Sequence, residues 1–156
     1  MGYTKDMIYF CTSGFSYDDW VGNFYPVGMP KQEWLVYYAH EFNTYELDST
    51  FYALLKLSSI KAILEKTDEG FLLPSLSMVT SRIGYIRFQG CNSAKWWQHE
   101  QAYERYDYNY APQELSQWLP KIQKLDSIAG KTFIFTNNHW REQAVSTIRQ
   151  LRVILD

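Results

Sequence analysis

The sequence predicts an α/β fold in which helices cover a parallel sheet, and three observations support this. Short apolar stretches typical of buried strands alternate with segments whose apolar residues recur at helical spacing. Each parallel crossover needs a connection of helix length, so this alternation favours a parallel sheet. The length of 156 residues and the hydrophobic content of 46% fit one compact domain over residues 1–156.

The first strand is expected at residues 7–11, an apolar run that ends in the small residues Thr12, Ser13 and Gly14. A turn-rich stretch follows. A helix is then predicted by apolar residues at steps of one, three, one and three, namely Trp34, Leu35, Tyr38, Ala39 and Phe42.

The second strand is expected at residues 44–48, where alternation places Thr44, Glu46 and Asp48 on one face. A second helix is indicated by Ile60, Ile63 and Leu64. Residues 68–81 contain Gly70 and Pro74 and show no sustained periodicity. This stretch is interpreted as a linker after two β/α units in residues 1–67.

Two further β/α units are predicted in residues 82–156. Residues 83–88 form the third strand, with Tyr85, Arg87 and Gln89 on one face. A helix begins at Pro112 and stops at Gly130, with Leu115, Trp118, Leu119, Ile122 and Leu125 on its apolar face. The last strand is expected at residues 131–136, and the closing helix is marked by Ala144, Ile148, Leu151 and Leu155.

Charge and composition exclude several classes of partner. The net charge of −2 argues against a broad surface for nucleic acid or anionic membrane, and neither partner is expected. No apolar run reaches the length of about 18 residues needed to span a bilayer, and no signal-peptide pattern stands at the N-terminus, so a cytoplasmic protein is expected. Cys11 and Cys91 form no CxxC pair, so no metal site is predicted, and the cofactor is left unassigned.

Several motifs together resemble the YecE-like family, which is also called domain-of-unknown-function family 72. In the first half these are residues 11–17, Trp20, Gly22, 24–26, 42–46 and 49–52. In the second half they are residues 85–88, Gly90, Asn92, Trp97, 105–108 and 135–139. The chain departs from the family at Gln89 and Cys91, where the family reads His and Arg, and at Asp48, where it reads Asn.

The resemblance implies a TIM-barrel-like fold whose first two and last two β/α units are present and whose central units are missing. A closed single-chain barrel needs roughly 250 residues. The expected architecture is therefore a half barrel of about four β/α units. We expect it to be completed in a homodimer, with the last strand of one chain beside the first strand of the other, because open edges and an apolar face favour association.

Parallel barrels carry their reactive groups at the carboxyl ends of the strands. Glu46, Asp48 and His139 are the predicted catalytic residues, because carboxylates two apart on a strand and a strand-end histidine suit acid/base chemistry. The predicted binding residues for a small polar or anionic ligand are Thr12, Ser13, Tyr17, Arg87, Asn92 and Asn137. Asn137 and Asn138 are also expected to cap the final helix.

Two functions from different classes remain open. The first is a small-molecule enzyme, or its relic, that works by carboxylate acid/base chemistry. The second is a noncatalytic binding or assembly module, in which Glu46 and Arg87 form a structural ion pair. The aromatic residues from Trp96 to Tyr110 leave a similar choice, between stacking a sugar or base and packing as a rigid loop over the barrel mouth or at a dimer seam.

Overall fold

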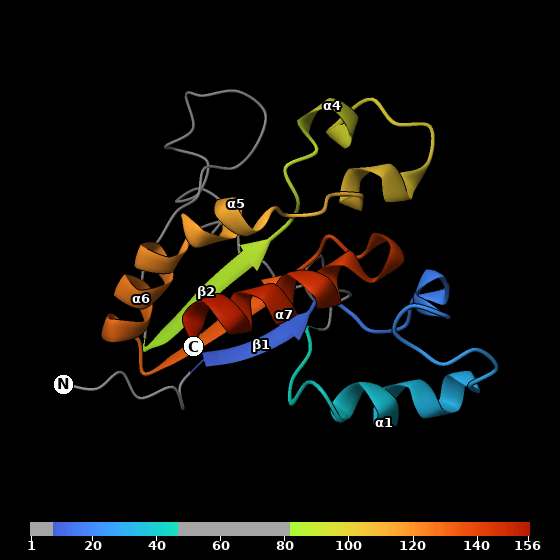
Figure 1. Ribbon diagram of the computed structural model, residues 1–156, viewed down its shortest axis with the longest axis horizontal. Helices are drawn as coiled ribbons and strands as arrows, with labels where there is room; N and C mark the ends of the chain where they lie inside the picture. The colour runs from blue at the N-terminus through green and yellow to red at the C-terminus, as the bar shows by residue number, and fades with distance from the viewer. Residues whose placement is uncertain (1–7, 47–81) are drawn as a thin grey trace, which may run out of the picture.

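The computed structural model describes residues 8–46 and 82–156, and its centre is a parallel three-stranded sheet (Figure 1). The strands are β1 (Ile8–Thr12), β2 (Ile83–Phe88) and β3 (Lys131–Thr136). Their order across the sheet is β1-β3-β2, with β3 paired in parallel to both neighbours. The predicted α/β class with a parallel sheet is confirmed.

The two faces of the sheet differ in what covers them. The register places Phe10, Ile134 and Ile86 side by side on one face, which packs into an apolar cluster with the helices. On the other face an aromatic row crosses the strands. It contains the stacked pair Tyr9 and Phe133, and the ring of Phe135 beside the ring of Tyr85.

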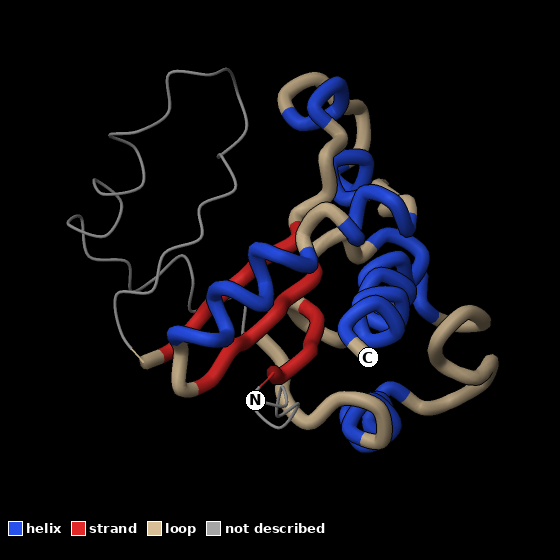
Figure 2. Tube along the Cα trace, turned by 60° about the vertical axis from the view of Figure 1, so that its left-hand side comes forward, coloured by secondary structure: helices blue, strands red, loops and turns tan. Residues whose placement is uncertain are grey.

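Three helices pack on the first of these faces. They are α5 (Pro112–Ser116), α6 (Leu119–Ile128) and α7 (Gln143–Leu155). Figure 2 shows α6 running along the strands and α7, which ends at the C-terminus, seen nearly end-on beside the sheet. The buried members of the shared core are Phe88, Tyr110, Leu115, Ile122, Ile134 and Leu151. These elements position the carboxyl ends of β2 and β3.

The sequence pattern predicts one helix from Pro112 to Gly130, whereas the structure has two, α5 and α6. Pro120 lies in the first turn of α6. Proline has no backbone N–H and clashes with the carbonyl four residues earlier, so a continuous helix would be broken at this point. The apolar spacing continues across the break because α5 and α6 both place apolar side chains against the sheet.

An aromatic cluster joins the N-terminal region to α7. It involves the short helix η2 (Asp18–Trp20) and α1 (Trp34–Ala39), which follows the short helix η3 (Lys31–Glu33). Its buried members are Trp20, Phe24, Tyr25, Trp34, Tyr38, Phe42, Ala144, Val145 and Ile148. The helix predicted near Trp34 is confirmed, and its buried side chains fix the loop that follows β1.

The predicted strand at residues 44–48 is represented by one bridge. Glu46 pairs in parallel with Ser13, and the Glu46 N–H donates to the Thr12 carbonyl at 3.1 Å. This segment therefore lies on the side of β1 away from β3. Asp48, the helix expected near Ile60 and the linker at residues 68–81 lie outside the described residues.

The strand pairing corrects one expectation. The last strand was expected to lie beside the first strand of a second chain, but β3 pairs with β1 of the same chain, from Ile8 opposite Thr132 to Thr12 opposite Thr136. The helix α7 explains this intramolecular pairing, because it contacts both β1 and β3. The strands β1 and β3 are therefore packed against the same helix.

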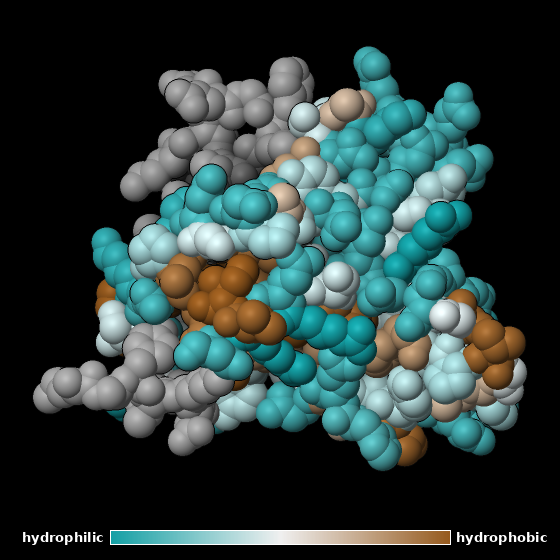
Figure 3. Space-filling view, viewed as in Figure 1, coloured by the Kyte–Doolittle hydropathy of each residue, from teal (hydrophilic) through white to brown (hydrophobic). Residues whose placement is uncertain are grey.

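Loops with short helices follow the carboxyl ends of β2 and β3. After β2 come α4 (Ser93–Trp96) and η4 (Ala102–Tyr106), and after β3 comes η5 (Trp140–Glu142). In Figure 1, α4 and η4 project beyond the end of β2. Apolar surface gathers near the C-terminal end of α7 (Figure 3). Among the described residues, no helix has both the length and the apolar character needed to cross a bilayer.

Candidate functional site

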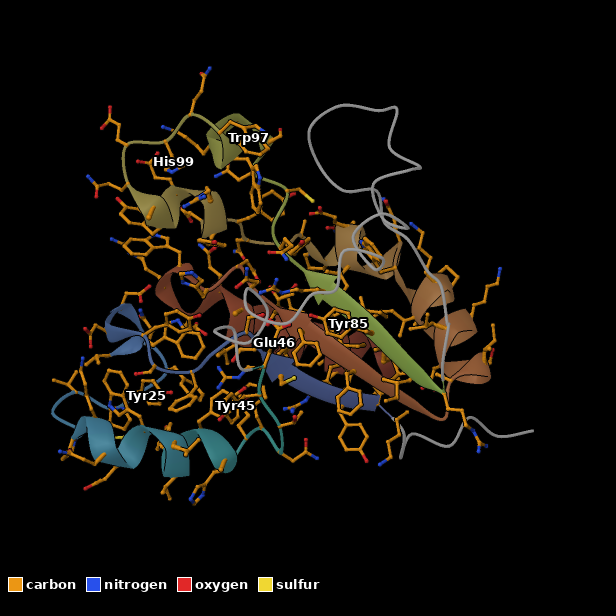
Figure 4. The ribbon with its side chains drawn as sticks, turned by 180° about the vertical axis from the view of Figure 1, so that it is seen from behind. Tyr25, Tyr45, Glu46, Tyr85, Trp97 and His99 are labelled. Carbon is orange, nitrogen blue, oxygen red and sulfur yellow. The ribbon has the colours of Figure 1, made fainter. Side chains whose placement is uncertain are left out.

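Glu46 lies at the centre of a polar cluster at the carboxyl end of the sheet. The hydroxyl groups of Ser13 and Tyr85 both donate to its carboxylate. Arg87 Nε lies 3.1 Å from Glu46 Oε2 and 3.2 Å from Ser13 Oγ. Figure 4 shows Glu46 and Tyr85 pointing toward each other over the sheet. We call Ser13, Glu46, Tyr85 and Arg87 the Glu46 cluster.

The backbone explains why these four residues meet. Ser13 directly follows β1, and its N–H donates to the Thr136 carbonyl, which continues the pairing with β3. Tyr85 and Arg87 are two apart in β2, so they project from the same face. The bridge between Ser13 and Glu46 then sets the carboxylate beside that face. The cluster thus forms for two reasons. Alternation along β2 puts Tyr85 and Arg87 on one face, and backbone pairing places Ser13 and Glu46 beside them.

The carboxylate and the guanidinium of the Glu46 cluster are shielded and chemically matched, while Tyr85 is 45% exposed. The side chains of Glu46 and Arg87 are each 10% exposed. An ionised carboxylate only accepts hydrogen bonds, and it faces two hydroxyl donors and a guanidinium here. Burial, followed by the neighbouring Glu46 carboxylate, raises the pKa of Tyr85 well above its usual value. Tyr85 therefore stays a neutral donor at physiological pH.

Cys11 lies on the same sheet face as Arg87 but offers no reactive thiolate. Its side chain is fully buried, and its thiol is 3.8 Å from the Ile134 carbonyl. Burial, with a smaller contribution from the Glu46 charge, raises the pKa of the Cys11 thiol. The thiolate is the nucleophilic form, so Cys11 is a packing residue. Cys91 is a free cysteine on the surface.

His139 lies between two tyrosine rings at the carboxyl end of β3. The Tyr17 ring stacks on it at 4.3 Å with an interplanar angle of 8°, and the Tyr106 ring lies 4.5 Å away at 32°. The Trp20 indole N–H donates to the His139 carbonyl at 2.6 Å. These contacts hold the imidazole in one orientation.

The start of α7 differs from the expected asparagine cap. The residue that precedes the helix is Glu142, and no side chain caps it. Arg141 and Glu142 adopt positive φ values of 46° and 67°, which are strained for residues with a Cβ atom. The Arg141 N–H donates to Asp19 Oδ2 at 2.7 Å. This turn keeps Asn137 and Asn138 away from the cap position, although the Asn138 amide donates to Thr147 Oγ1 within α7 at 2.9 Å.

Thr12 and Tyr17 contact protein groups near the Glu46 cluster. Thr12 is fully buried, and its hydroxyl donates to the Gly14 carbonyl at 2.5 Å and lies 2.9 Å from the Tyr38 hydroxyl. The Tyr17 hydroxyl donates to the Ser13 carbonyl at 2.5 Å. Tyr17 therefore contacts both the Glu46 cluster and His139. The buried Thr12 stabilises the loop that follows β1. Ligand contacts by either residue stay a prediction.

The predicted asparagines occupy two different places. Asn137 is 6% exposed, and its amide donates to Gln89 Oε1 at 2.7 Å. Asn92 donates to the carbonyls of Glu104 and Asp107 at 2.9 and 3.1 Å. Asn137 thus pairs within the strand-end region, whereas Asn92 holds a surface loop together.

Sequence reasoning missed two residues of this region. Tyr85 was placed on the face of Arg87 by strand alternation, and that signal was sufficient to include it in the site. The tilted Tyr106 ring contacts His139 from the loop after β2, and no local pattern indicates that contact. Within residues 8–46 and 82–156, no group of three His, Cys, Asp or Glu is placed to hold a metal ion.

The fold and this geometry define a class of protein, an α/β protein with a polar cluster at the carboxyl ends of parallel strands. The model of DUF72, described as a protein family of unknown function, matches residues 9–75 and 72–156. The chain therefore belongs to the DUF72 family. The two matched segments meet within the stretch that the sequence pattern identifies as a linker.

Solved structures give a second comparison. A DUF72 family protein from Thermotoga maritima aligns with a TM-score of 0.73 and 18% identity, over 96% of this chain and 99% of that one. At this identity the likeness concerns the fold alone. A DUF72 family protein from Enterococcus faecalis aligns at 25% identity and a TM-score of 0.48, over 53% of this chain and 31% of that one. No curated protein matches the chain.

Proposed function

We propose that the carboxyl ends of the strands bind a small polar or anionic ligand, with Glu46 as the acid/base group. One observation carries this proposal. Three donors from β2 and the end of β1 converge on a single carboxylate at the end of the sheet where β/α proteins hold their ligands. Fixed donors around a shielded charge are typical of a preorganised site.

His139 and Arg87 have supporting roles in this proposal. His139 is held between Tyr17 and Tyr106, and a histidine transfers protons near neutral pH. Arg87 presents a planar guanidinium, whose geometry suits carboxylate or phosphate groups. Tyr17 connects the two parts of the site, since it contacts both Ser13 and His139.

A specific observation favours the second function, a noncatalytic binding or assembly module. Both carboxylate oxygens of Glu46 accept hydrogen bonds from protein groups, Oε1 from Tyr85 and Oε2 from Ser13. A carboxylate with this set of partners suits a structural ion pair with Arg87. In this function Glu46 links the ends of the strands through its partners. Its charge then stabilises the fold and takes no part in a reaction.

Ligand-dependent thermal shifts separate the two functions. Melting temperatures are measured for the wild type, Glu46→Gln and Arg87→Ala with inorganic phosphate, sugar phosphates, dicarboxylates and neutral sugars. The proposed site predicts a ligand-induced rise in the wild type that both substitutions reduce. Arg149→Ala removes the surface pair with Glu41 and is the matched control. A rise unchanged by both substitutions would place binding elsewhere.

The fold supports a half barrel of the DUF72 type. The Glu46 segment lies beside β1, β1 beside β3, and β3 beside β2. A last strand that pairs with the first strand is the arrangement that closes a β/α barrel. The chain is shorter than the roughly 250 residues of a complete barrel, so central units are proposed to be missing.

We propose that a second copy completes this barrel. A two-fold axis along the barrel would keep all strands parallel and would set the β2 edge of one chain against the Glu46 segment of the other. The aromatic row on the face away from α6 and α7 would then form the barrel interior. The Glu46 clusters of both copies would open at the same end.

A further inference from the structure

Residues 91–107, which we call the arm, have no core of their own. Every residue of the arm is exposed or half-buried, whereas Phe88 before it is 2% exposed and Tyr110 after it is 5% exposed. Segments with few buried apolar contacts open locally at the lowest free-energy cost. Figure 4 shows Trp97 and His99 at the outer end of the arm, away from the sheet.

Contacts inside the arm hold it together as one unit. The Asn92 amide donates to the carbonyls of Glu104 and Asp107, at 2.9 and 3.1 Å. Lys95 Nζ lies 2.8 Å from Glu104 Oε2. These interactions join α4 to η4 and do not involve the sheet. The arm can therefore move without losing its internal structure.

The two ends of the arm are tied to each other at its base. The Gly90 N–H donates to the Tyr110 hydroxyl at 2.9 Å, and the Tyr110 ring packs edge-on against Phe88 at 5.5 Å. Gly90 has a φ of +90°, a conformation that glycine adopts at little cost. A long loop with close ends and a glycine at its base suits a hinged lid.

Three contacts attach the arm to the loop after β3. The Tyr106 ring lies 4.5 Å from His139, the Tyr103 ring stacks on Trp140 at 3.8 Å and 12°, and the Gln143 amide donates to Asp107 Oδ1 at 2.8 Å. We call the Tyr103 stack and the Gln143 hydrogen bond the latch. The latch is small and solvent-exposed on one side, since Tyr103 is 36% exposed.

We infer that the arm is a lid, which opens as a unit about Gly90 and the Asp107–Tyr108 junction and uncovers the Tyr106 side of His139. Opening breaks the Tyr106 contact with His139 and the latch, while Tyr17 keeps the other side of His139 covered. The use of this opening for ligand entry rests on the proposed function. The opening itself is a property of the free protein and is tested without ligand.

Two readouts on the full chain test the lid. Hydrogen exchange compares the amides of the arm with those of β3, and diethyl pyrocarbonate measures how accessible the His139 ring is. Tyr103→Ala weakens the latch, and Trp97→Ala is the matched control. Trp97 is an arm residue that is 67% exposed and stacks on no ring of the described residues. Gln143→Ala removes the other part of the latch from outside the arm.

The lid predicts faster exchange in the arm than in β3, and His139 modification accelerated roughly two- to tenfold by Tyr103→Ala, the range expected for losing one aromatic pair. Gln143→Ala should act in the same direction, and Trp97→Ala should leave the rate unchanged. Arm amides as protected as those of β3 would overturn the inference. Equal rates in Tyr103→Ala, Gln143→Ala and Trp97→Ala would overturn it as well. Neither outcome bears on ligand binding at Glu46.

Discussion

At the scale of single residues, Glu46 is the side chain on which the site depends. Three side chains from different parts of the chain donate to it or pair with it, and it is largely shielded from water. A shielded charge contributes stability only while its partners are present. The charge of Glu46 and the hydroxyl of Tyr85 can therefore be tested by conservative substitutions.

Replacing Glu46 with Gln should lower the free energy of unfolding by about 1–3 kcal/mol, because it removes the charge from the shielded Glu46–Arg87 ion pair. Urea unfolding at neutral pH measures the loss. Glu41→Gln is the control, since it breaks pairs with Arg149 and Arg152, whose side chains are 51% and 35% exposed, and should cost under about 1 kcal/mol. Equal losses in the two variants would mean that the Glu46–Arg87 pair behaves as a surface pair.

The tyrosines make stability sensitive to alkaline pH. Tyr85 has a raised pKa through burial and the Glu46 charge, and burial raises the pKa of Tyr38 to about 12. Unfolded tyrosines ionise near pH 10.0, the ordinary value. The unfolded state therefore releases protons first, and the stability present below pH 10.0 is lost as the pH rises above it.

Tyr85→Phe should make this alkaline loss shallower by less than about 1.4 kcal/mol per pH unit, the slope that one ionising group contributes, because solvent screens the half-exposed Tyr85. The measurement is the free energy of unfolding of both proteins at several pH values between neutral and alkaline. Tyr45→Phe is the control, at a tyrosine of similar exposure outside the Glu46 cluster, 40% against 45% for Tyr85. If the free energy of unfolding depends on pH in the same way in the wild type and in Tyr85→Phe, Tyr85 has the same pKa in the folded and unfolded states.

Sequence reasoning located the centre of the site and missed part of its surroundings. Glu46 and Arg87 were identified because strand alternation and barrel geometry are local signals. The contact of Tyr106 with His139 depends on how the loop after β2 folds back onto the loop after β3. The spacing of residues in the sequence does not indicate this arrangement. Asp48 falls outside the described residues, so its catalytic role stays a prediction.

At the scale of elements, the strands were predictable and the helix boundaries less so. The predicted bounds of β2 and β3 match the structure, because each is a short run rich in aromatic and β-branched residues. The helix from Pro112 to Gly130 was predicted without a break, since the apolar spacing continues across Pro120. The asparagine cap of α7 was also wrong, because the turn at Arg141 and Glu142 intervenes.

The base of the arm gives a test at this scale. Gly90→Ala should destabilise the protein by about 1–3 kcal/mol, because the positive φ is strained and the new Cβ atom would lie 2.9 Å from the Tyr108 Cβ atom. Gly28→Ala is the matched control, with a φ of +83° and no atom within 4 Å of the added Cβ. Thermal unfolding compares the two. If both cost the same, the close approach to Tyr108 has no energetic role.

At the scale of the whole molecule, the proposed completion of a half barrel by a second copy makes a prediction about mass. We expect a dimer of twice 18.5 kDa in dilute solution, measured by sedimentation equilibrium. Arg82→Asp, at the start of β2, should shift the equilibrium toward monomer if the β2 edge lies in the interface. A monodisperse single chain at micromolar concentration would contradict completion by a second copy.

The central claim is that the strand ends around Glu46 bind a ligand, and a calorimetric titration tests it most directly. The ligand is the member of the thermal-shift panel that raises the melting temperature most. We predict saturable binding of one ligand per chain to the wild type, and affinity weakened by roughly tenfold or more in Arg87→Ala, since a hydrogen bond to a charged group is lost. Equal affinity in the two proteins, or no binding by any member of the panel, would contradict the claim.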